Sequence, residues 1–351
     1  MTGSVSPQAT IGFLGPSGTF TEQALRSDPE LALARRRPLP SFVHVLSAVT
    51  SGEVDYGFVA IENSIEGTVS VALDQLVFER DLIIVAEVIL PVTQNLLAPA
   101  GATLDGIRRV VSFPHATGQC RTWLGANLPG VEEVAATSTA EAARQVAEAV
   151  PMEAAAAAHA TWARPPAPAR SAADLHTAAD LHTAAIGTVL AAELYGLEVL
   201  APGIEDHIDN STRFVLVAPP HTGVPAPTGH DKTSVVCFQS SDHPGSLHGI
   251  LGQFSARDLN LVKLESRPTK KGLGEYCFII DFEGHVADEV VADCLRDLHA
   301  GLRELKFLGS YPAAGDHAGA RRRHADRAWK AADRWISDIR SQVAPAPHST
   351  E

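Results

Sequence analysis

A proline- and glycine-rich stretch, residues 219–229, divides this chain of 351 residues into two parts. It holds four prolines and two glycines, a composition that favours an extended linker over a packed helix or strand. The longer part before it can bury cores of its own, and the part after it has the size of one small domain. We therefore expect a linker at 219–231 between two independently packed regions.

The region after the linker, residues 232–312, has the predicted order strand, helix, strand, strand, helix, strand. Its first helix places Leu247, Ile250, Leu251 and Phe254 on one apolar face, and the second does the same with Val291, Cys294, Leu295 and Leu298. This order is the ferredoxin-like βαββαβ arrangement. The expected strands are Thr233–Gln239, Leu261–Glu265, Tyr276–Phe282 and Phe307–Tyr311.

The region before the linker, residues 9–218, alternates strand-like and helix-like segments, which is typical of an α/β fold. Pro91 interrupts a long apolar run, and we interpret this break as the crossing from a first lobe (about 9–90 and 200–218) to a second lobe (about 91–199). First-lobe strands are expected at Ala9–Leu14, Ser41–Val45, Tyr56–Ile61, Leu82–Leu90 and Thr212–Ala218, with helices from Thr19 and over Leu46–Gly52. Second-lobe strands are expected at Val92–Leu97, Arg109–Ser112, Val131–Ala135 and Leu197–Ala201, with helices at His115–Asn127, Thr139–Ala149 and Thr188–Tyr195.

Two segments lie outside these patterns. Residues 153–183 contain five consecutive alanines and a six-residue unit that occurs twice, so we expect a surface insertion with little fixed structure. His176 and His182 arise from that duplication, and we do not interpret them as a metal site. Residues 313–351 carry an apolar stripe that predicts an amphipathic helix packed on the protein itself or on a second subunit. The stripe consists of Trp329, Ala332, Ile336, Ile339 and Val343.

Composition narrows the classes of function. The formal net charge is −13, and proteins that bind nucleic acid need a basic surface, so nucleic acid is not expected as a partner. The chain has no run of about 18 apolar residues, and its first ten residues lack Lys and Arg, so neither a membrane span nor a secretory signal is expected. The four cysteines, Cys120, Cys237, Cys277 and Cys294, have no paired spacing that would predict disulfides or zinc. These features favour a cytoplasmic protein.

Four polar loops follow predicted strands, which is where open α/β sheets place their ligands. A glycine-rich turn before a helix exposes N–H groups that attract anions, and Arg213 can hold a carboxylate through two hydrogen bonds. Alone, the glycine-rich turn fits an ordinary turn about as well, and Arg213 also fits a strand-end ion pair. For Glu62–Thr68, a polar turn that caps the following helix is the better fit. The loops are Gly15–Thr21 (GPSGTFT), Glu62–Thr68 (ENSIEGT), Ser112–Cys120 (SFPHATGQC) and Asn210–Phe214 (NSTRF).

In this order, the motifs GPxGTFT, ENSxEGTV and NxTRF resemble prephenate dehydratase. Downstream, His243-Pro244-Gly245-Ser246-Leu247 and Glu265-Ser266-Arg267-Pro268 resemble the regulatory ACT domain of that family. The resemblance covers about Ala9 to Pro312 apart from the insertion. It implies a bilobed catalytic domain like type II periplasmic binding proteins, with the substrate between the lobes.

The resemblance assigns roles to individual residues. Thr212 matches the family's signature threonine and is expected to be the catalytic residue. The matching positions expected to bind substrate are Thr19, Asn63, Ser64, Ser112, Gln119, Arg213 and Phe214. The second-lobe motif departs from the usual Ser-His-Pro-Gln, since here it reads Ser112-Phe113-Pro114-His115.

The reaction that this implies needs no cofactor and no metal. Prephenate loses a carboxylate as carbon dioxide and a ring hydroxyl as water, and aromatisation drives the conversion to phenylpyruvate. The enzyme has to orient the substrate and assist the leaving hydroxyl. The threonine hydroxyl is a poor acid, so it is expected to act as a positioned hydrogen-bond donor.

In ACT domains an amino acid binds where the loop after the first strand meets a neighbouring subunit, so the resemblance implies a homodimer or a homotetramer. It places phenylalanine, as a feedback inhibitor, near Asp242, Gly245, Ser246, Leu247, Glu265 and Ser266. Two other functions fit the same residues: an arogenate dehydratase, and a sensor without catalysis in which a binding-protein-like domain is coupled to an ACT module.

Overall fold

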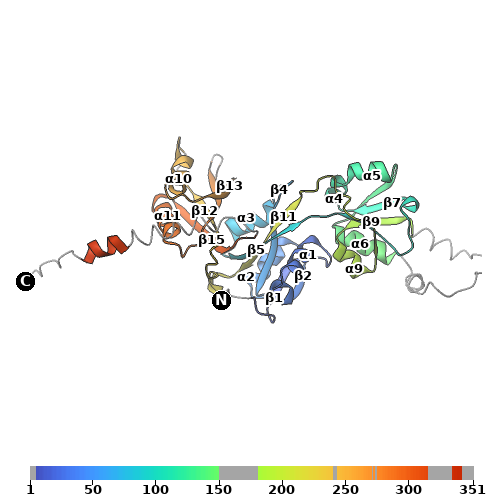
Figure 1. Ribbon diagram of the computed structural model, residues 1–351, viewed down its shortest axis with the longest axis horizontal. Coiled ribbons are helices and arrows are strands. Elements are labelled where there is room, and N and C mark those ends of the chain that lie inside the picture. Colours follow the sequence, from blue (N-terminus) through green and yellow to red (C-terminus); the bar gives the residue numbers. More distant parts are fainter. Residues whose placement is uncertain are drawn as a thin grey trace, which may run out of the picture. The chain divides into compact units, whose positions relative to one another are not determined.

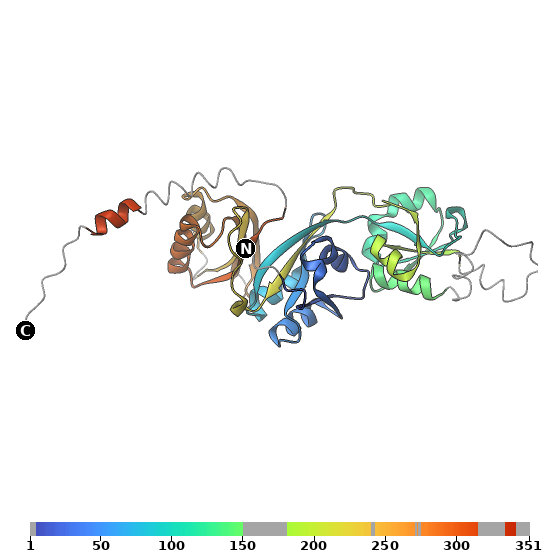
Figure 2. The same cartoon turned by 60° about the horizontal axis from the view of Figure 1, so that its bottom comes forward.

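The computed structural model describes residues 5–149, 181–239, 243–270, 272, 275–314 and 334–341 (Figures 1 and 2). The contacts within the chain define two compact units. The N-terminal unit comprises residues 5–75 and 88–215. The C-terminal unit comprises residues 76–87 and the described part of the chain from Leu216 onward.

The first lobe is built on a sheet with the strand order β2-β1-β3-β11-β5, and β4 pairs with β3. β1 pairs in parallel with both β2 and β3. The strands are β1 (Thr10–Leu14), β2 (Arg35–Leu39), β3 (Tyr56–Asn63), β4 (Gly67–Thr68), β5 (Ile83–Pro91) and β11 (Ser211–Ala218). The helices are α1 (Phe20–Ser27), α2 (Phe42–Thr50) and α3 (Ser70–Asp74).

One predicted strand of this lobe is wrong. Ser41–Val45 was expected to be extended, but Ser41 caps α2, its hydroxyl accepting a hydrogen bond from the His44 N–H at 3.3 Å. The helix buries Val45, Leu46 and Val49 on one face, which is the helical period. The strand at this place in the order is instead β2, which the sequence analysis missed because its charged, exposed residues show no alternation.

The second lobe holds a five-stranded sheet with the order β10-β6-β9-β7-β8. Helices α4 and α5 cover one face, and α6 and α9 cover the other, each over a buried apolar cluster (Figure 1). The strands are β6 (Asn95–Ala98), β7 (Arg109–Ser112), β8 (Glu132–Ala135), β9 (Thr183–Gly187) and β10 (Glu198–Ala201). The helices are α4 (Pro114–Gln119), α5 (Arg121–Asn127), α6 (Thr139–Glu148) and α9 (Val189–Tyr195).

The chain enters the second lobe after β5 and leaves it after β10 to form β11 of the first sheet. Two crossings between two α/β sheets make the bilobed architecture that the sequence analysis expected, and this prediction is confirmed. The helix predicted over His115–Asn127 is divided at Cys120, whose backbone leaves the helical region. The proposed insertion at 153–183 lies outside the described residues except for its last three.

The C-terminal module has the order β12-α10-β13-β14-α11-β15 and an antiparallel sheet with strand order β13-β14-β12-β15. The predicted ferredoxin-like arrangement is therefore confirmed. Both helices pack on one face of the sheet, where the rings of Phe254 and Phe282 meet edge to face with centroids 5.0 Å apart. The elements are β12 (Asp231–Phe238), α10 (Ser246–Ser255), β13 (Leu261–Pro268), β14 (Tyr276–Glu283), α11 (Glu289–Gly301) and β15 (Glu304–Pro312).

Beyond this module, residues 334–341 form an exposed helix that includes Ile336 and Ile339 of the predicted stripe. Trp329, Ala332 and Val343 lie outside the described residues. Within the described parts of the chain, no helix is long and apolar enough to cross a membrane.

The segment Leu76–Glu87 was not expected to belong to the C-terminal unit. Gly309 of β15 lies so close to it that a Cβ atom there would be 2.3 Å from the Ile84 carbonyl oxygen, and the backbone φ of Gly309 is +143°. Only glycine combines this conformation with this close approach.

We expect Gly309→Ala to lower the free energy of unfolding by about 2–4 kcal/mol, through backbone strain and overpacking. Urea unfolding of the whole chain measures this change. The matched control is Gly252→Ala in α10, where an added Cβ meets nothing within 4 Å and the helix gains about 0.5–1 kcal/mol. Equal stability of the two variants would contradict the close contact.

Candidate active site

Asn63, the last residue of β3, holds the side chain of Thr212 in place. Its Nδ2 atom donates hydrogen bonds to Thr212 Oγ1 at 2.9 Å, to Asn210 Oδ1 at 2.7 Å and to the Ser211 carbonyl at 3.3 Å. Its Oδ1 atom accepts from two main-chain N–H groups of the following loop, at 3.0 and 2.9 Å. The carboxamide is therefore fixed at both ends, and its orientation is set.

This arrangement determines what the Thr212 hydroxyl can do. Because the oxygen accepts a hydrogen bond from Asn63, its own hydrogen is directed elsewhere. In the described part of the chain, no group accepts a hydrogen bond from that hydroxyl. Thr212 is half-buried, so the hydroxyl is a positioned donor without an internal acceptor.

Ser64 joins the same two loops. Its N–H donates to the Ser211 carbonyl at 2.9 Å, and its Oγ atom accepts from the Ser211 N–H at 2.9 Å. The hydroxyl also donates to the Asp209 carbonyl at 3.2 Å. These hydrogen bonds join the loop after β3 to the start of β11 beside Thr212. They limit how far either segment can move without the other.

A row of side-chain amides leads from Thr212 to the second lobe. Asn210, which is 2% exposed, donates to Gln119 Oε1 at 3.5 Å, and Gln94 donates to the same oxygen at 3.3 Å. Gln94 is also 2% exposed, and its Oε1 atom has no hydrogen-bond partner among the described residues. The row brings Gln119, a predicted substrate-binding residue, to the same place as Asn63 and Thr212.

Asn210 and Gln94 were not singled out from the sequence. Asn210 opens the NxTRF motif, but nothing in the residue order indicates that its side chain turns toward Asn63. Gln94 stands within an apolar run, and a polar residue in such a run is the available signal that its amide is buried for a reason.

The glycine-rich turn caps α1. The Thr19 hydroxyl accepts from the Glu22 N–H at 3.3 Å and donates to the Leu14 carbonyl at 3.1 Å. Just before this helix, the Gly18 N–H donates to the buried Glu22 carboxylate at 2.8 Å. Arg26 binds the other oxygen of that carboxylate at 2.6 Å. The helix start thus has an internal anion.

The same turn contacts the second lobe. The Thr188 hydroxyl, which caps α9, donates to the Gly18 carbonyl at 2.7 Å, and the Tyr195 hydroxyl donates to the Ser17 carbonyl at 2.8 Å. A Cβ on Gly18 would lie 3.1 Å from the Ala191 Cα, and the φ of Gly18 is +89°. Glycine is needed here both for the backbone conformation and for the close approach of the lobes.

Three predicted substrate-binding side chains are engaged inside the protein. Ser112 is fully buried and donates to the Ile186 carbonyl at 3.2 Å. Arg213 pairs with Glu62 at 3.3 Å, and the ring of Phe214 stacks on Phe58 with centroids 5.4 Å apart. Their contact with substrate stays a prediction. In this conformation they support β11, which carries Thr212, and β7, which precedes the helix that carries Gln119.

His115, where the second-lobe motif departs from its family, contacts the first lobe. Its Nε2 atom lies 2.6 Å from a carboxylate oxygen of Glu66, in the loop after β3. Nearby, Cys120 is fully buried, and burial, with Asp206 and Glu205 close by, raises the pKa of its thiol to about 12. This thiol stays protonated at neutral pH and does not supply a nucleophile.

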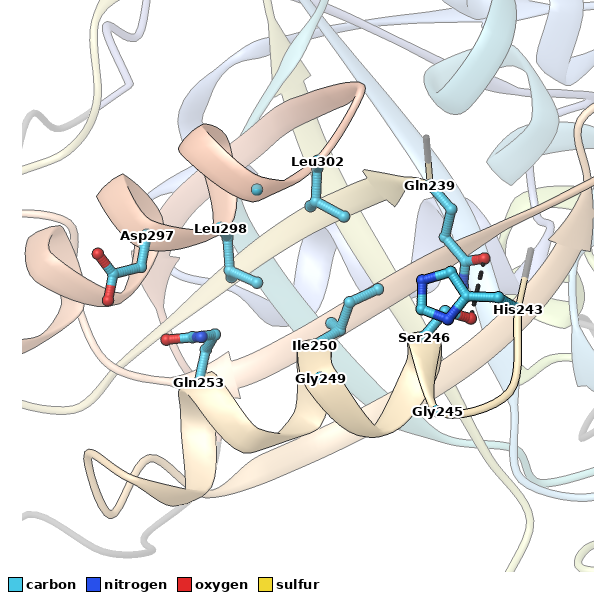
Figure 3. Close-up of a pocket in the computed structure, with 11 residues that line it drawn as sticks. Gln239, His243, Gly245, Ser246, Gly249, Ile250, Gln253, Asp297, Leu298 and Leu302 are labelled. Atoms are coloured by element: carbon cyan, nitrogen blue, oxygen red, sulfur yellow. Dashed lines mark hydrogen bonds between the residues drawn. The ribbon is translucent and has the colours of Figure 1, made fainter. Parts of the chain in front are cut away.

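A second candidate site lies in the C-terminal module, where a pocket of about 300 Å³ opens between α10 and α11 (Figure 3). Ile250, Leu298 and Leu302 give it an apolar wall, and Gln239 and Ser246 are polar groups at one end. Gln239 accepts from the Ser246 hydroxyl at 3.2 Å, while its Nε2 atom is buried without a partner among the described residues. A pocket of this size and polarity suits a small amphiphilic ligand.

The pocket includes two of the residues predicted to bind phenylalanine, Gly245 and Ser246. Leu247 packs against the apolar core of the module instead. Glu265 lies on β13 between Lys263 and Arg267, at 3.4 and 3.7 Å, and Ser266 is exposed. Asp242 lies outside the described residues.

Comparisons with known proteins agree with this architecture. The sequence profile of prephenate dehydratase matches residues 11–165 and 166–222, and that of the ACT domain matches residues 233–300. A prephenate dehydratase of Mycobacterium tuberculosis is 37% identical over 94% of each chain.

Two solved structures are similar over most of the chain. A prephenate dehydratase from Arthrobacter aurescens in complex with L-Phe is 38% identical, with a TM-score of 0.76 over 95% of this chain and 99% of that one. A protein described as a novel type of quorum-quenching acylase is 28% identical, with a TM-score of 0.69 over 87% and 98%. By sequence profile, by relatives and by fold, this chain belongs to the prephenate dehydratase family.

Proposed function

We propose that this protein is a prephenate dehydratase, a carbon–oxygen lyase that converts prephenate to phenylpyruvate for phenylalanine synthesis. The observation that carries the proposal is the Thr212 hydroxyl, whose oxygen is held by Asn63 and whose hydrogen is available. The family to which the chain belongs supports the choice of reaction. We also propose a cytoplasmic location and an assembly of at least two subunits.

The reaction balances without an added oxidant or reductant. The bond between the ring and its carboxylate breaks, and the electron pair forms a ring double bond as carbon dioxide leaves. The ring carbon–oxygen bond breaks at the opposite position, and the departing hydroxide takes a proton from solvent to become water. The ring becomes aromatic, so the protein need only position the substrate and stabilise the leaving oxygen.

Thr212 stabilises the leaving oxygen by donating a hydrogen bond to it as negative charge develops there. Asn63 acts through Thr212, because its N–H group occupies the threonine lone pair and directs the O–H bond outward. Gln119 and Gln94 come from the second lobe and meet Asn210 at the same place. Substrate bound there would contact both lobes.

We expect Thr212→Ala to lower kcat by about 10²–10³, the usual cost of removing one donor to a developing oxyanion. Thr212→Ser keeps the hydroxyl and should retain most of the activity. Absorbance of phenylpyruvate measures both rates. A Thr212→Ala variant that turns over at nearly the wild-type rate would remove the proposed role.

Asn63→Asp tests the orientation of the hydroxyl. A carboxylate has no N–H to donate and would instead accept the Thr212 hydrogen, so kcat should fall about as far as in Thr212→Ala. Combining the two substitutions should add little further loss, because both remove the same donor. Asn127→Asp, which removes an amide donor bonded to the Trp123 carbonyl away from this site, is the matched control. Additive losses would contradict the coupling.

Two rival functions are separated by a side-by-side assay with prephenate and arogenate. For a prephenate dehydratase, kcat/KM is higher with prephenate. A higher kcat/KM with arogenate would make the chain an arogenate dehydratase, which carries out the same elimination on the aminated substrate. Binding of either compound without turnover would identify the non-catalytic sensor.

We further propose that L-phenylalanine is the effector and that it occupies the pocket between α10 and α11. The aromatic ring would lie against Ile250, Leu298 and Leu302, and Gln239 Nε2 would donate to the carboxylate. The bound L-Phe named for the Arthrobacter protein supports this choice. Contact with Asp242, Leu247, Glu265 and Ser266, from this or a neighbouring subunit, remains part of the prediction.

Filling the pocket tests this assignment. Gly249 lines it, and an added Cβ there meets nothing within 4 Å, so Gly249→Leu should fold normally and raise the Kd of phenylalanine at least tenfold. Gly252→Leu, on the same helix but outside the pocket, is the control. If Glu265→Ala or Ser266→Ala relieves inhibition and Gly249→Leu does not, phenylalanine binds at β13 and not in this pocket.

A further inference from the structure

The segment Leu76–Glu87, here called the coupling segment, stands between α3 and the middle of β5. It precedes the linker by more than a hundred residues, yet its contacts place it in the C-terminal unit. The chain on either side of it, up to Gln75 and from Val88, belongs to the N-terminal unit. Its residues are not part of the βαββαβ fold, so side-chain and main-chain contacts must attach them to that module.

Lys306 of β15 holds the first end of the coupling segment. Its ammonium group donates to three carbonyl oxygens, those of Leu76 at 2.7 Å, Val77 at 3.2 Å and Arg80 at 2.8 Å. These carbonyls lie in and just after the helical turn Gln75–Glu79, where helix ends leave acceptors unsatisfied. Burial lowers the pKa of Lys306, against the opposing effect of the Asp81 and Glu304 carboxylates.

Glu87 holds the other end. Its side chain is completely buried, and one oxygen accepts from Lys232 Nζ at 2.7 Å and from the Ala314 N–H at 2.8 Å. A buried carboxylate is tolerated only where such partners compensate it. Between the two ends, Phe78 meets Phe238 edge to face with centroids 6.3 Å apart, and Gly309 lies against Ile84. The segment is therefore attached to β12 and β15 at four places.

Beyond Glu87 the same strand leads to the catalytic residue. β5 continues to Pro91, and the next residue, Val92, donates its N–H to the Asn210 carbonyl at 2.8 Å. Asn210 accepts from Asn63, and Asn63 orients Thr212. The path from the Glu87 carboxylate to the Thr212 hydroxyl thus follows one extended strand and then a series of hydrogen bonds.

We propose that the coupling segment transmits the state of the regulatory module to Thr212, with Lys306 and Glu87 as positioning residues that make the segment follow β12 and β15. The proposal rests on the effector binding proposed above. A change in the module that shifts β12 or β15 displaces Glu87, and β5 carries the displacement to Val92. The Asn210 carbonyl and side chain then move, and Asn63 no longer presents the Thr212 hydroxyl in its active orientation.

The test compares the whole protein with Lys306→Met, which removes the ammonium group and keeps the aliphatic stem. Lys306→Arg restores a cation, and Glu87→Gln keeps the shape at the other end in case Lys306→Met does not fold. Arg296→Met is the control, since it removes a cation of the same module whose ion pair, with Asp293 at 2.9 Å, lies within α11. Calorimetry measures phenylalanine binding, and amide hydrogen exchange is followed in peptides that cover residues 84–92 and 206–214.

In the wild type and in Arg296→Met, phenylalanine should change exchange in both peptides by about fivefold or more, the lower range of allosteric coupling. In Lys306→Met and Glu87→Gln, phenylalanine should still bind, while the exchange response falls below about twofold and activity at saturating phenylalanine rises. Lys306→Arg should recover part of the response. Basal turnover without phenylalanine should stay within about twofold of the wild-type value.

The proposal is overturned if bound phenylalanine changes exchange only within residues 232–312, or if both substituted proteins keep the full response. Absence of phenylalanine binding to the wild type would overturn the effector and this route together. An exchange response in a protein that does not dehydrate prephenate would instead refute the proposed activity and leave the coupling standing, because hydrogen exchange does not depend on catalysis.

Discussion

The proposed active site depends on the hydrogen bonds made by the carboxamide of Asn63. One small group has its oxygen bound to the main chain of its own loop and its nitrogen bound to the β11 end, including Thr212. A side chain with a single kind of hydrogen-bonding atom could not do both. The chemistry proposed for Thr212 is therefore a property of the pair, which comes together because β3 and β11 are neighbouring strands of one sheet.

The organisation of the fold can be predicted from the sequence wherever one segment carries its own pattern of apolar residues. The helical faces around Ile250 and Cys294 predicted the C-terminal module, and the apolar run broken at Pro91 predicted the crossing between lobes. β2 was not predicted because it is an exposed edge strand that buries few side chains. Its sequence therefore shows no alternation of apolar and polar residues. The helix of Ser41–Val45 was misread because its capping serine precedes residues that also favour strands.

The residues of the proposed active site could be selected from motifs, but the directions of their side chains could not. Thr212 and Asn63 were both identified, and the structure joins them directly. The direction of Arg213 and Phe214 could not be predicted, because β11 is an inner strand of its sheet and is packed on both faces, so alternation does not separate an active face from a core face. Side-chain contacts between residues 94, 119 and 210 depend on how the two lobes meet, which no single segment encodes.

The buried Glu22 carboxylate has a consequence for anion binding at the start of α1. The start of α1 is the place where a binding protein of this architecture would be expected to attract an anion, and here the protein supplies its own. The Gly18 N–H is thereby not available to a bound anion, and the Gly18 carbonyl accepts from the Thr188 hydroxyl of the second lobe. This turn is therefore engaged by the protein's own carboxylate and by a contact between the lobes.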